Sequence, residues 1–311
     1  MNKYVLSLII VVVIAAGLVY TFTKSSKNET KKPSENAAIT KTAVTSNKTA
    51  SHCEKGNLTS SGSTALAPLV QAVAKKYQEN CKDAHITVNL GGSGTGLANV
   101  ENGSSDIGNS DIFAKEGQED LVDHQVAVAL FAIIVNSKVT VKGLTTEQIK
   151  GIYAGTTTNW KEVGGSDLPI VVVSRPTSSG TRATFQKYVL GGPETVSGPE
   201  SLTTDSAGTV IKNVQQNDGA IGYVGTGPAK KAGLTMLKID NVEPTADNVK
   251  NGSYKYWNIE HMYTKGEAKP LAKSLIDYML SDDAKAAAAS LDYMAISDVS
   301  QDLLKTHQNS K

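Results

Sequence analysis

The chain has only two cysteines among its 311 residues, and aromatic side chains make up 5% of it. It contains neither the His-Glu-x-x-His motif of a zinc protease nor the lysine loop that holds nucleotide phosphates. The histidines have no spacing typical of metal ligands or of a catalytic triad; they are His52, His85, His124, His261 and His307. These absences argue against an enzyme and against a bound cofactor.

Two glycine-rich patterns also fall short of enzyme motifs. The segment Gly91-Gly-Ser93-Gly-Thr95 has threonine where the nucleophile elbow of a serine hydrolase needs its last glycine. Leu97 occupies the position where a dinucleotide-binding fingerprint needs its third glycine. We therefore expect no catalysis, no cofactor and no metal.

The body of the chain also lacks a surplus of positive charge. Residues 1–52 carry seven lysines and two glutamates, so the remainder has 24 basic and 28 acidic residues, a net charge of −4. Such a body is a poor partner for nucleic acid, which needs a cationic surface. It can still bind one small anion, because local dipoles rather than net charge do that work.

The longest uncharged run lies near the N-terminus. Residues 5–22 are 18 residues without a charge, the lower limit for a helix that crosses a bilayer. No cysteine follows this run directly, as a lipoprotein signal requires, and no clear cleavage site follows it. We expect residues 1–23 to form an uncleaved membrane anchor, with a cleaved signal as the alternative and a lipid anchor less favoured. Residues 24–53, rich in Lys, Ser, Thr, Asn and Ala, are predicted to be a disordered tether.

Three segments repeat one arrangement: a strand, a turn rich in Ser, Thr and Gly, and the start of a helix. The turns are Gly62-Ser-Thr-Ala65 after strand 58–60, Gly91-Gly-Ser-Gly-Thr-Gly96 after strand 85–90, and 175–182 after strand 170–173. A helix N-terminus offers free N–H groups and partial positive charge, so it binds oxyanions. The alternative is that each turn is an ordinary helix cap. Three such turns beside Asp111 favour a site for one small oxyanion.

The rest of the body alternates strands and helices. Residues 127–135 form an apolar run typical of a buried strand. A capping box at Thr145 predicts a helix through Tyr153, Ser206 opens another helix, and 219–224 reads as a strand. Helices are expected at 269–280 and 281–291. This order predicts an α/β fold with mainly parallel sheets.

Four motifs together carry a family resemblance. They are Gly-Ser-Thr-Ala-Leu at 62–66, Gly-Gly-Ser-Gly-Thr-Gly at 91–96, Asp-Ile-Gly-Asn-Ser-Asp at 106–111, and Arg175 with Ser-Gly-Thr-Arg at 179–182. In order and spacing they resemble the PstS family, the phosphate-binding proteins of the Pst ABC transporters, in its Gram-positive form. Glu260-His-Met-Tyr263 also resembles that group, and the resemblance spans roughly residues 57 to 300.

The resemblance implies a two-lobed periplasmic-binding-protein fold of type II, with a hinge and a cleft between the lobes. Lobe I would be residues 54–135 plus 256–311, and lobe II would be 136–255. The body would lie on the outer face of the cytoplasmic membrane as a monomer. It would deliver inorganic phosphate to the membrane permease subunits of an ABC importer. In that compartment Cys53 and Cys81 are expected to form a disulfide, with two free thiols as the alternative.

Carried over position by position, the ligand residues of the family fall on Thr64, Ala65, Ser93, Asp111, Arg175, Ser179, Gly180 and Thr181. Ala65 would contribute only its backbone N–H, and Arg175 a bidentate fork of donors. Asp111 would accept a hydrogen bond from the proton that phosphate carries near neutral pH. Arg182 and Ser206 are weaker candidates. Arg182 would support Asp111 or face solvent on its helix, and we place it outside direct contact with the ligand.

Two other kinds of protein remain possible from the sequence. An adhesive or structural surface protein would make the three turns incidental. A receptor for sulfate or molybdate would share the fold, but a fully deprotonated anion would offer Asp111 no proton.

Overall fold

The computed structural model describes residues 53–195, 202–204 and 206–309. The expected anchor at 1–23 and nearly all of the expected tether at 24–53 lie outside these residues. No helix in the described part of the chain has both the length and the apolar composition needed to cross a bilayer.

The first sheet follows the strand order β2-β1-β3-β10-β4, with β11 added on β4. The pairs β1–β2 and β1–β3 are parallel, whereas β10 runs antiparallel to both β3 and β4. Its strands are β1 (Gly56–Gly62), β2 (Ala84–Leu90), β3 (Ile107–Ser110), β4 (Leu121–Val135), β10 (Trp257–Lys265) and β11 (Tyr293–Ala295).

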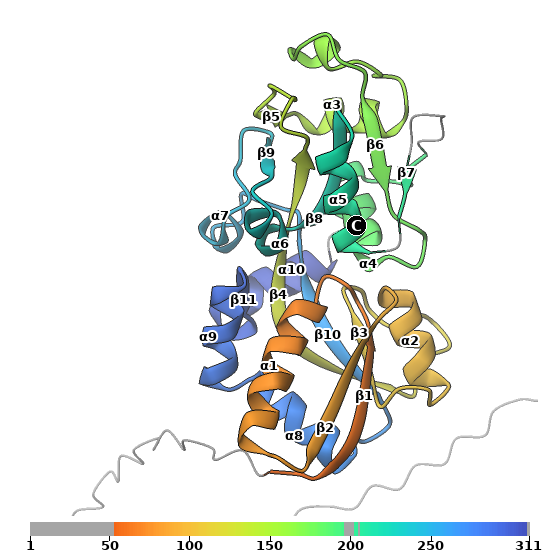
Figure 1. Cartoon of the computed structure of the whole chain (residues 1–311), viewed down its shortest axis with the longest axis vertical. Coiled ribbons are helices and arrows are strands. Elements are labelled where there is room, and N and C mark those ends of the chain that lie inside the picture. Colours follow the sequence, from red (N-terminus) through yellow and green to blue (C-terminus); the bar gives the residue numbers. More distant parts are fainter. Residues whose placement is uncertain (1–52, 196–201, 205, 310–311) are drawn as a thin grey trace, which may run out of the picture. The chain divides into compact units, whose positions relative to one another are not determined.

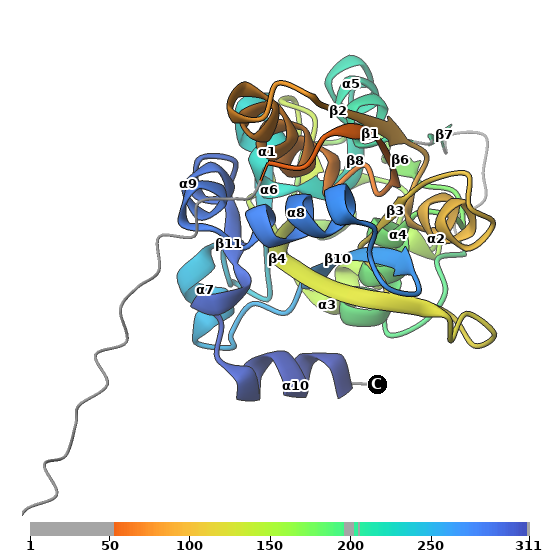
Figure 2. The same ribbon diagram turned by 90° about the horizontal axis from the view of Figure 1, so that it is seen from below.

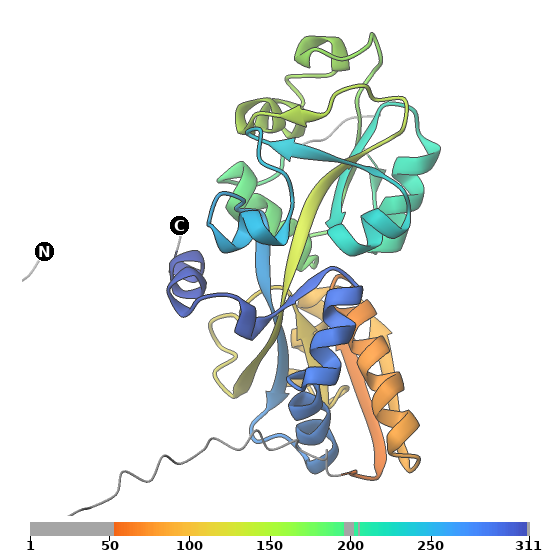
Figure 3. The ribbon, with the colours of Figure 1, turned by 90° about the vertical axis from the view of Figure 1, so that its left-hand side faces the viewer.

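The second sheet begins on the same strand β4 and follows the order β4-β8-β6-β7. Strand β9 also pairs with β4, and β5 pairs with β9. Its further strands are β5 (Gly143–Leu144), β6 (Val171–Ser174), β7 (Leu202–Thr203), β8 (Ala220–Gly225) and β9 (Thr235–Ile239). Residues 121–130 of β4 pair with β10, and 131–135 pair with β8, so one long strand belongs to both sheets (Figure 3).

Helices cover both sheets (Figure 1). Helices α1, α8 and α9 contact one another beside the first sheet, and α2 packs on β1, β3 and β10 (Figure 2). Around the first sheet lie α1 (Ala67–Asn80), α2 (Ser93–Glu101), α8 (Pro270–Met279), α9 (Asp282–Ser290), a 3₁₀ turn η3 (Ile296–Asp298) and α10 (Gln301–Asn309). Around the second lie α3 (Thr146–Tyr153), a 3₁₀ turn η1 (Trp160–Val163), α4 (Gly180–Phe185), a π-helical turn η2 (Gln186–Leu190), α5 (Ala207–Gln216), α6 (Thr226–Lys231) and α7 (Ala246–Lys250).

Most local expectations are met. The apolar run 127–135 is buried along its whole length as part of β4. The Thr145 capping box is present, because the Thr145 side chain accepts a hydrogen bond from the Gln148 N–H and the Gln148 side chain reaches back to the cap. Ser206 and Ser281 cap α5 and α9 in the same way, each accepting a backbone N–H.

The expectation of mainly parallel sheets is wrong. Strand β4 is antiparallel to each of its partners, β8, β9, β10 and β11. The antiparallel pairing around β4 arises because β4 carries the chain from the first sheet into the second, and β10 runs beside it in the opposite direction. Parallel pairing persists in β1–β2, β1–β3, β5–β9, β6–β7 and β6–β8.

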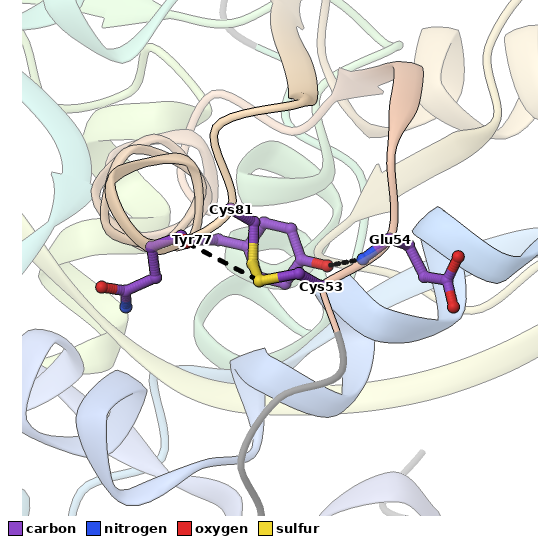
Figure 4. Close-up of a disulfide and its surroundings, with 5 residues drawn as sticks. Cys53, Glu54, Tyr77 and Cys81 are labelled. Atoms are coloured by element: carbon purple, nitrogen blue, oxygen red, sulfur yellow. Dashed lines mark hydrogen bonds between the residues drawn. A yellow bond between two sulfur atoms is a disulfide. The ribbon is translucent and has the colours of Figure 1, made fainter.

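A disulfide joins the start of the first strand to the end of the first helix. Cys53 and Cys81 are bonded, with their Cα atoms 5.2 Å apart (Figure 4). Next to it, the Glu54 N–H donates a 3.1 Å hydrogen bond to the Tyr77 hydroxyl on α1. The disulfide therefore holds the segment just before β1 against the end of α1.

Candidate functional site

Four strand ends supply the residues of the site. Ser63 to Leu66 follow β1, the start of α2 follows β2, Asp111 follows β3, and residues 175–182 follow β6. The strands β1, β2 and β3 are mutually aligned in parallel, so their carboxyl ends meet at one edge of the first sheet. This edge is where ligands bind in open α/β sheets.

On the first sheet, the side chains gather around Asp111. The Ser63 hydroxyl donates a hydrogen bond to Asp111 Oδ1. The same Ser63 oxygen accepts the backbone N–H groups of Ala65 and Leu66 at 3.0 and 2.9 Å. The Ser93 oxygen, at the start of α2, accepts the Asp111 backbone N–H at 2.9 Å. Asp111 is thereby fixed at both its backbone and its carboxylate.

On the second sheet, the turn after β6 presents Arg175 and the start of α4. Ser179 caps α4, with its hydroxyl oxygen accepting the Arg182 N–H at 3.3 Å. Arg182 does not reach toward Asp111: its Nη1 donates to the Arg175 carbonyl at 2.6 Å, and its Nε pairs with Glu194 at 3.2 Å. Arg182 thus supports the backbone of Arg175 from behind.

The two halves of the site touch directly. Arg175 Nη2 donates to Thr64 Oγ1 at 3.1 Å, and the Thr181 hydroxyl donates to Asp111 Oδ2 at 2.8 Å. The Gly94 N–H donates to the Ser178 carbonyl at 2.9 Å. The eight residues carried over from the resemblance therefore lie on segments that meet at one place, although the set spans more than one hundred residues of the chain.

Gly180 is the point of closest approach between the halves. A Cβ atom at this position would collide with the Ser93 hydroxyl and would lie 2.9 Å from the Asp111 Cβ. The absence of a side chain lets the start of α4 pack against Ser93 and Asp111. A larger residue would force the halves apart.

Water is largely excluded from the site. Arg175 and Asp111 are each 1% exposed, and the remaining polar side chains of the set, Thr64, Ser93, Ser179 and Thr181, are buried as well. Burial of a charge is costly unless hydrogen bonds and an opposite charge compensate it. The donors and the guanidinium are therefore arranged to stabilise negative charge in a medium that screens it poorly.

Sequence reasoning missed four residues that shape Asp111 and Ala65. Ser63 lies inside the predicted turn 62–65, but the sequence did not indicate its hydrogen bond to Asp111. Asn258 Nδ2 donates to the Asp111 backbone carbonyl, and the Tyr293 hydroxyl donates to the Ala65 carbonyl. Glu260, on β10, lies fully buried beside Asp111. Asn258, Glu260 and Tyr293 are more than 140 residues away from their partners in sequence, and only the Glu260-His-Met-Tyr263 motif drew attention to that region.

A cavity of about 730 Å³ opens next to the site. Its walls come from α1, α5, α6 and α9, and Thr64 and Ala207 belong to its lining. The Ala207 N–H, at the start of α5, donates to Thr64 Oγ1 at 3.4 Å. Solvent in this cavity thus comes within reach of Thr64. The described residues hold no cluster of three His, Cys, Asp or Glu side chains that could bind a metal ion.

Residues 47–283 match the PBP superfamily domain. The chain is 47% identical over 249 residues to the phosphate-binding protein PstS of Bacillus subtilis (strain 168), a match that covers 78% of this chain and 82% of that protein. The chain therefore belongs to the PBP superfamily and, within it, to the family of PstS phosphate-binding proteins.

Solved structures agree with this assignment. One is a proposed phosphate ABC transporter substrate-binding protein from Clostridium perfringens with bound phosphate, at 35% identity and a TM-score of 0.73, covering 78% of this chain and 100% of that one. Another is an ABC-type phosphate transport receptor from Vibrio cholerae, at 30% identity and a TM-score of 0.62, covering 76% of this chain and 99% of that one. The expected α/β fold of the periplasmic-binding-protein type is confirmed.

Proposed function

We propose that this protein captures inorganic phosphate outside the cytoplasm and delivers it to the permease of an ABC importer. The observation that carries the proposal is the meeting of two halves at one buried site that combines Arg175, Asp111 and several hydroxyl and N–H donors. The family supports it, because the relatives are named phosphate-binding and phosphate-transport proteins. They are substrate-binding proteins of transporters, and the same role without catalysis or a cofactor is proposed here.

Each residue of the proposed ligand set has a chemical task. Arg175 pairs two of its N–H groups with phosphate oxygens. Thr64, Ser93, Ser179 and Thr181 supply hydroxyl donors, and Ala65 and Gly180 supply backbone N–H groups at helix starts. Asp111 accepts the hydrogen bond of the phosphate proton.

Closure of two lobes would enclose the ion. The lobes proposed are residues 54–135 plus 256–311, and residues 136–255, joined where β4 and β10 run side by side. Phosphate would replace the direct contacts that Arg175 makes with Thr64 and that Thr181 makes with Asp111. The cavity beside Thr64 offers a route for the ion into the site.

The protein is proposed to act as a monomer at the outer face of the cytoplasmic membrane, held by residues 1–23 through the tether 24–53. The 18 uncharged residues at 5–22 and the lack of a cysteine directly after them support this anchor. Intact mass of the membrane-extracted protein tests it. A mature chain that begins after residue 22, or at a lipidated Cys53, would exclude the anchor.

Calorimetric titration of the purified protein with phosphate, sulfate and molybdate tests the ligand. We expect saturable, one-to-one binding of phosphate and much weaker binding of the other two anions. Binding of sulfate as tight as that of phosphate would refute phosphate selectivity. No binding of any oxyanion would leave the surface-protein alternative.

A further inference from the structure

Glu260 is a carboxyl group buried in the wall of the site, and no cation of the described residues forms an ion pair with it. The residue is 0% exposed, and no group among the described residues donates a hydrogen bond to either of its carboxyl oxygens. A buried carboxylate without donors or a counter-charge is strongly disfavoured. The group therefore needs another way to be accommodated.

Glu260 lies on β10, the strand that pairs with β3 immediately before Asp111. Strands β10 and β3 are antiparallel, with Tyr263 opposite Gly108, Met262 opposite Asn109 and His261 opposite Ser110. The Asn258 side chain, two residues before Glu260 and on the same face of β10, donates a hydrogen bond to the Asp111 backbone carbonyl, which brings the Glu260 carboxyl beside that of Asp111. Two like charges in contact in a buried site repel each other.

Two carboxyl groups in contact can form a hydrogen bond only when one of them carries a proton. Burial and the neighbouring charge of Asp111 both raise the pKa of the Glu260 carboxyl well above its usual range. Asp111 is the better placed of the two to hold the charge, because Ser63 and Thr181 each donate a hydroxyl to it. Glu260 is therefore the member of the pair that holds the proton.

We propose that Glu260 is a protonated acid that donates its hydrogen bond to Asp111 and keeps Asp111 a pure acceptor toward the ligand. This inference rests on the proposed function, in which Asp111 accepts the proton of phosphate. A carboxylate offers about four acceptor positions. Once phosphate has replaced Thr181, the donors to Asp111 are Ser63, Glu260 and the phosphate hydroxyl, so the selected anion is one that brings a proton of its own.

The pair also sets how selectivity responds to acid. If Asp111 itself took up a proton, it could donate a hydrogen bond, and an unprotonated anion such as sulfate would become acceptable. A hydrogen bond donated by Glu260 holds Asp111 in its role as an acceptor. Tyr293 on β11 is a further titratable group beside the pair, and burial is the main cause that raises its pKa, so it stays neutral. His261, the next residue of β10, pairs with Asp123 at 2.8 Å.

The functional test compares Glu260→Gln, whose amide can still donate to Asp111, with Glu260→Met, which has similar length and no donor. The affinities for phosphate and for sulfate are measured by calorimetry from pH 5 to pH 8 at fixed salt. We expect the ratio of phosphate affinity to sulfate affinity to be the same in E260Q as in the wild type. In E260M we expect this ratio to fall by at least about tenfold, with the largest fall at the acid end of the pH range. A wild-type ratio in E260M at every pH, or equal losses in both variants, would overturn the proposal.

Infrared spectroscopy of the ligand-free protein detects whether the Glu260 carboxyl is protonated. The wild-type protein at pH 7 should show the carbonyl stretch of a protonated carboxylic acid in a water-excluded site. E260Q should lack this band, and the control Asp123→Asn, which removes a carboxylate from the neighbouring strand, should retain it. A band that is absent from the wild type, or present in E260Q, would refute a protonated Glu260.

Calorimetry and infrared spectroscopy together distinguish a failure of the proposed function from a failure of the protonated Glu260. If the wild-type protein binds no phosphate, the proposed function fails, while the infrared band still decides the protonation of Glu260. If E260M does not fold, E260Q decides: loss of the band with an unchanged affinity ratio supports the pair, and loss of selectivity in E260Q overturns it.

Discussion

At the residue scale, Arg175 is the only arginine that faces the other half of the site. Arg182, the second arginine of the chain, instead pairs with Glu194 and holds the Arg175 carbonyl. A guanidinium offers a planar fork that matches two oxygens of one anion, whereas an ammonium group is a point charge. Arg182 thus positions the backbone of Arg175, the arginine proposed to bind the ligand.

Replacement of Arg175 by lysine should keep the charge and lose the fork. We expect Arg175→Lys to weaken phosphate binding by at least about 1.4 kcal/mol, or tenfold in affinity. Calorimetry measures the affinity, and thermal unfolding of the same sample checks that the variant is folded. An unchanged affinity would remove Arg175 from contact with the ion.

Replacement of Asp111 by asparagine should change selectivity more than affinity. The amide still offers a carbonyl acceptor to the phosphate proton, but it carries no charge and can rotate its NH₂ group to donate to sulfate. We expect the ratio of phosphate affinity to sulfate affinity to fall in Asp111→Asn at a fixed pH near 7. A ratio that stays constant would mean that selectivity lies elsewhere.

At the element scale, the disulfide ties the start of β1 to the end of α1, the helix that follows the first turn of the site. Cys53 and Cys81 are 28 residues apart. A cross-link across a loop of that size restricts the unfolded chain and is worth about 3.5 kcal/mol in the chain-entropy estimate. The bridge therefore stabilises β1 and α1, the elements on either side of the turn with Thr64 and Ala65.

The double variant Cys53→Ser, Cys81→Ser should unfold more easily by up to about 3.5 kcal/mol in denaturant titrations. Phosphate affinity should change little, because the bridge lies at the far end of α1 from the site. Peptide mapping of the wild-type protein without reductant should show the two cysteine peptides linked. Two freely alkylated thiols in the native protein would contradict the bridge.

At the scale of the whole molecule, the C-terminal helix α10 joins elements from both sheets. His307 on α10 stacks on Trp257 of β10 at 3.6 Å and on Tyr188 of η2 at 3.9 Å between ring centroids. Its Nε2–H donates to the Trp257 carbonyl at 2.8 Å. Burial is the main cause that lowers the pKa of His307, to about 4.

This histidine should make stability depend on pH. Between pH 6.5 and about 4 the unfolded chain binds a proton at His307 and the folded chain does not, so stability is lost as the pH falls through this window. The largest loss is about 3 kcal/mol. The measurement is the difference in unfolding free energy between wild type and His307→Phe, which keeps the stacking and cannot titrate.

The unfolding free energy of the wild type minus that of His307→Phe should decrease from pH 7 to pH 4.5. It isolates His307 from His124, whose pKa burial also lowers. A difference that is constant over this range would show that His307 does not carry the pH dependence.

The sequence by itself determined the local parts of the protein. Hydrophobic runs, capping residues and glycine turns act over a few residues, and they predicted β4, the starts of α3 and α5, the helix α9, and the strand–turn–helix segments of the site. The family resemblance added the set that includes Arg175 and Asp111. A pairing of cysteines was expected from their even number and their compartment.

Only the tertiary structure decided how these parts meet. The antiparallel direction of β4 and β10 follows from their shared passage between the sheets, which no local pattern encodes. The places of Asn258, Glu260 and Tyr293 beside Asp111 and Ala65 depend on strand register across more than 140 residues. Long-range packing decides which strands lie side by side, so a buried glutamate that looks in sequence like any strand residue comes to lie beside Asp111, the proposed ligand residue.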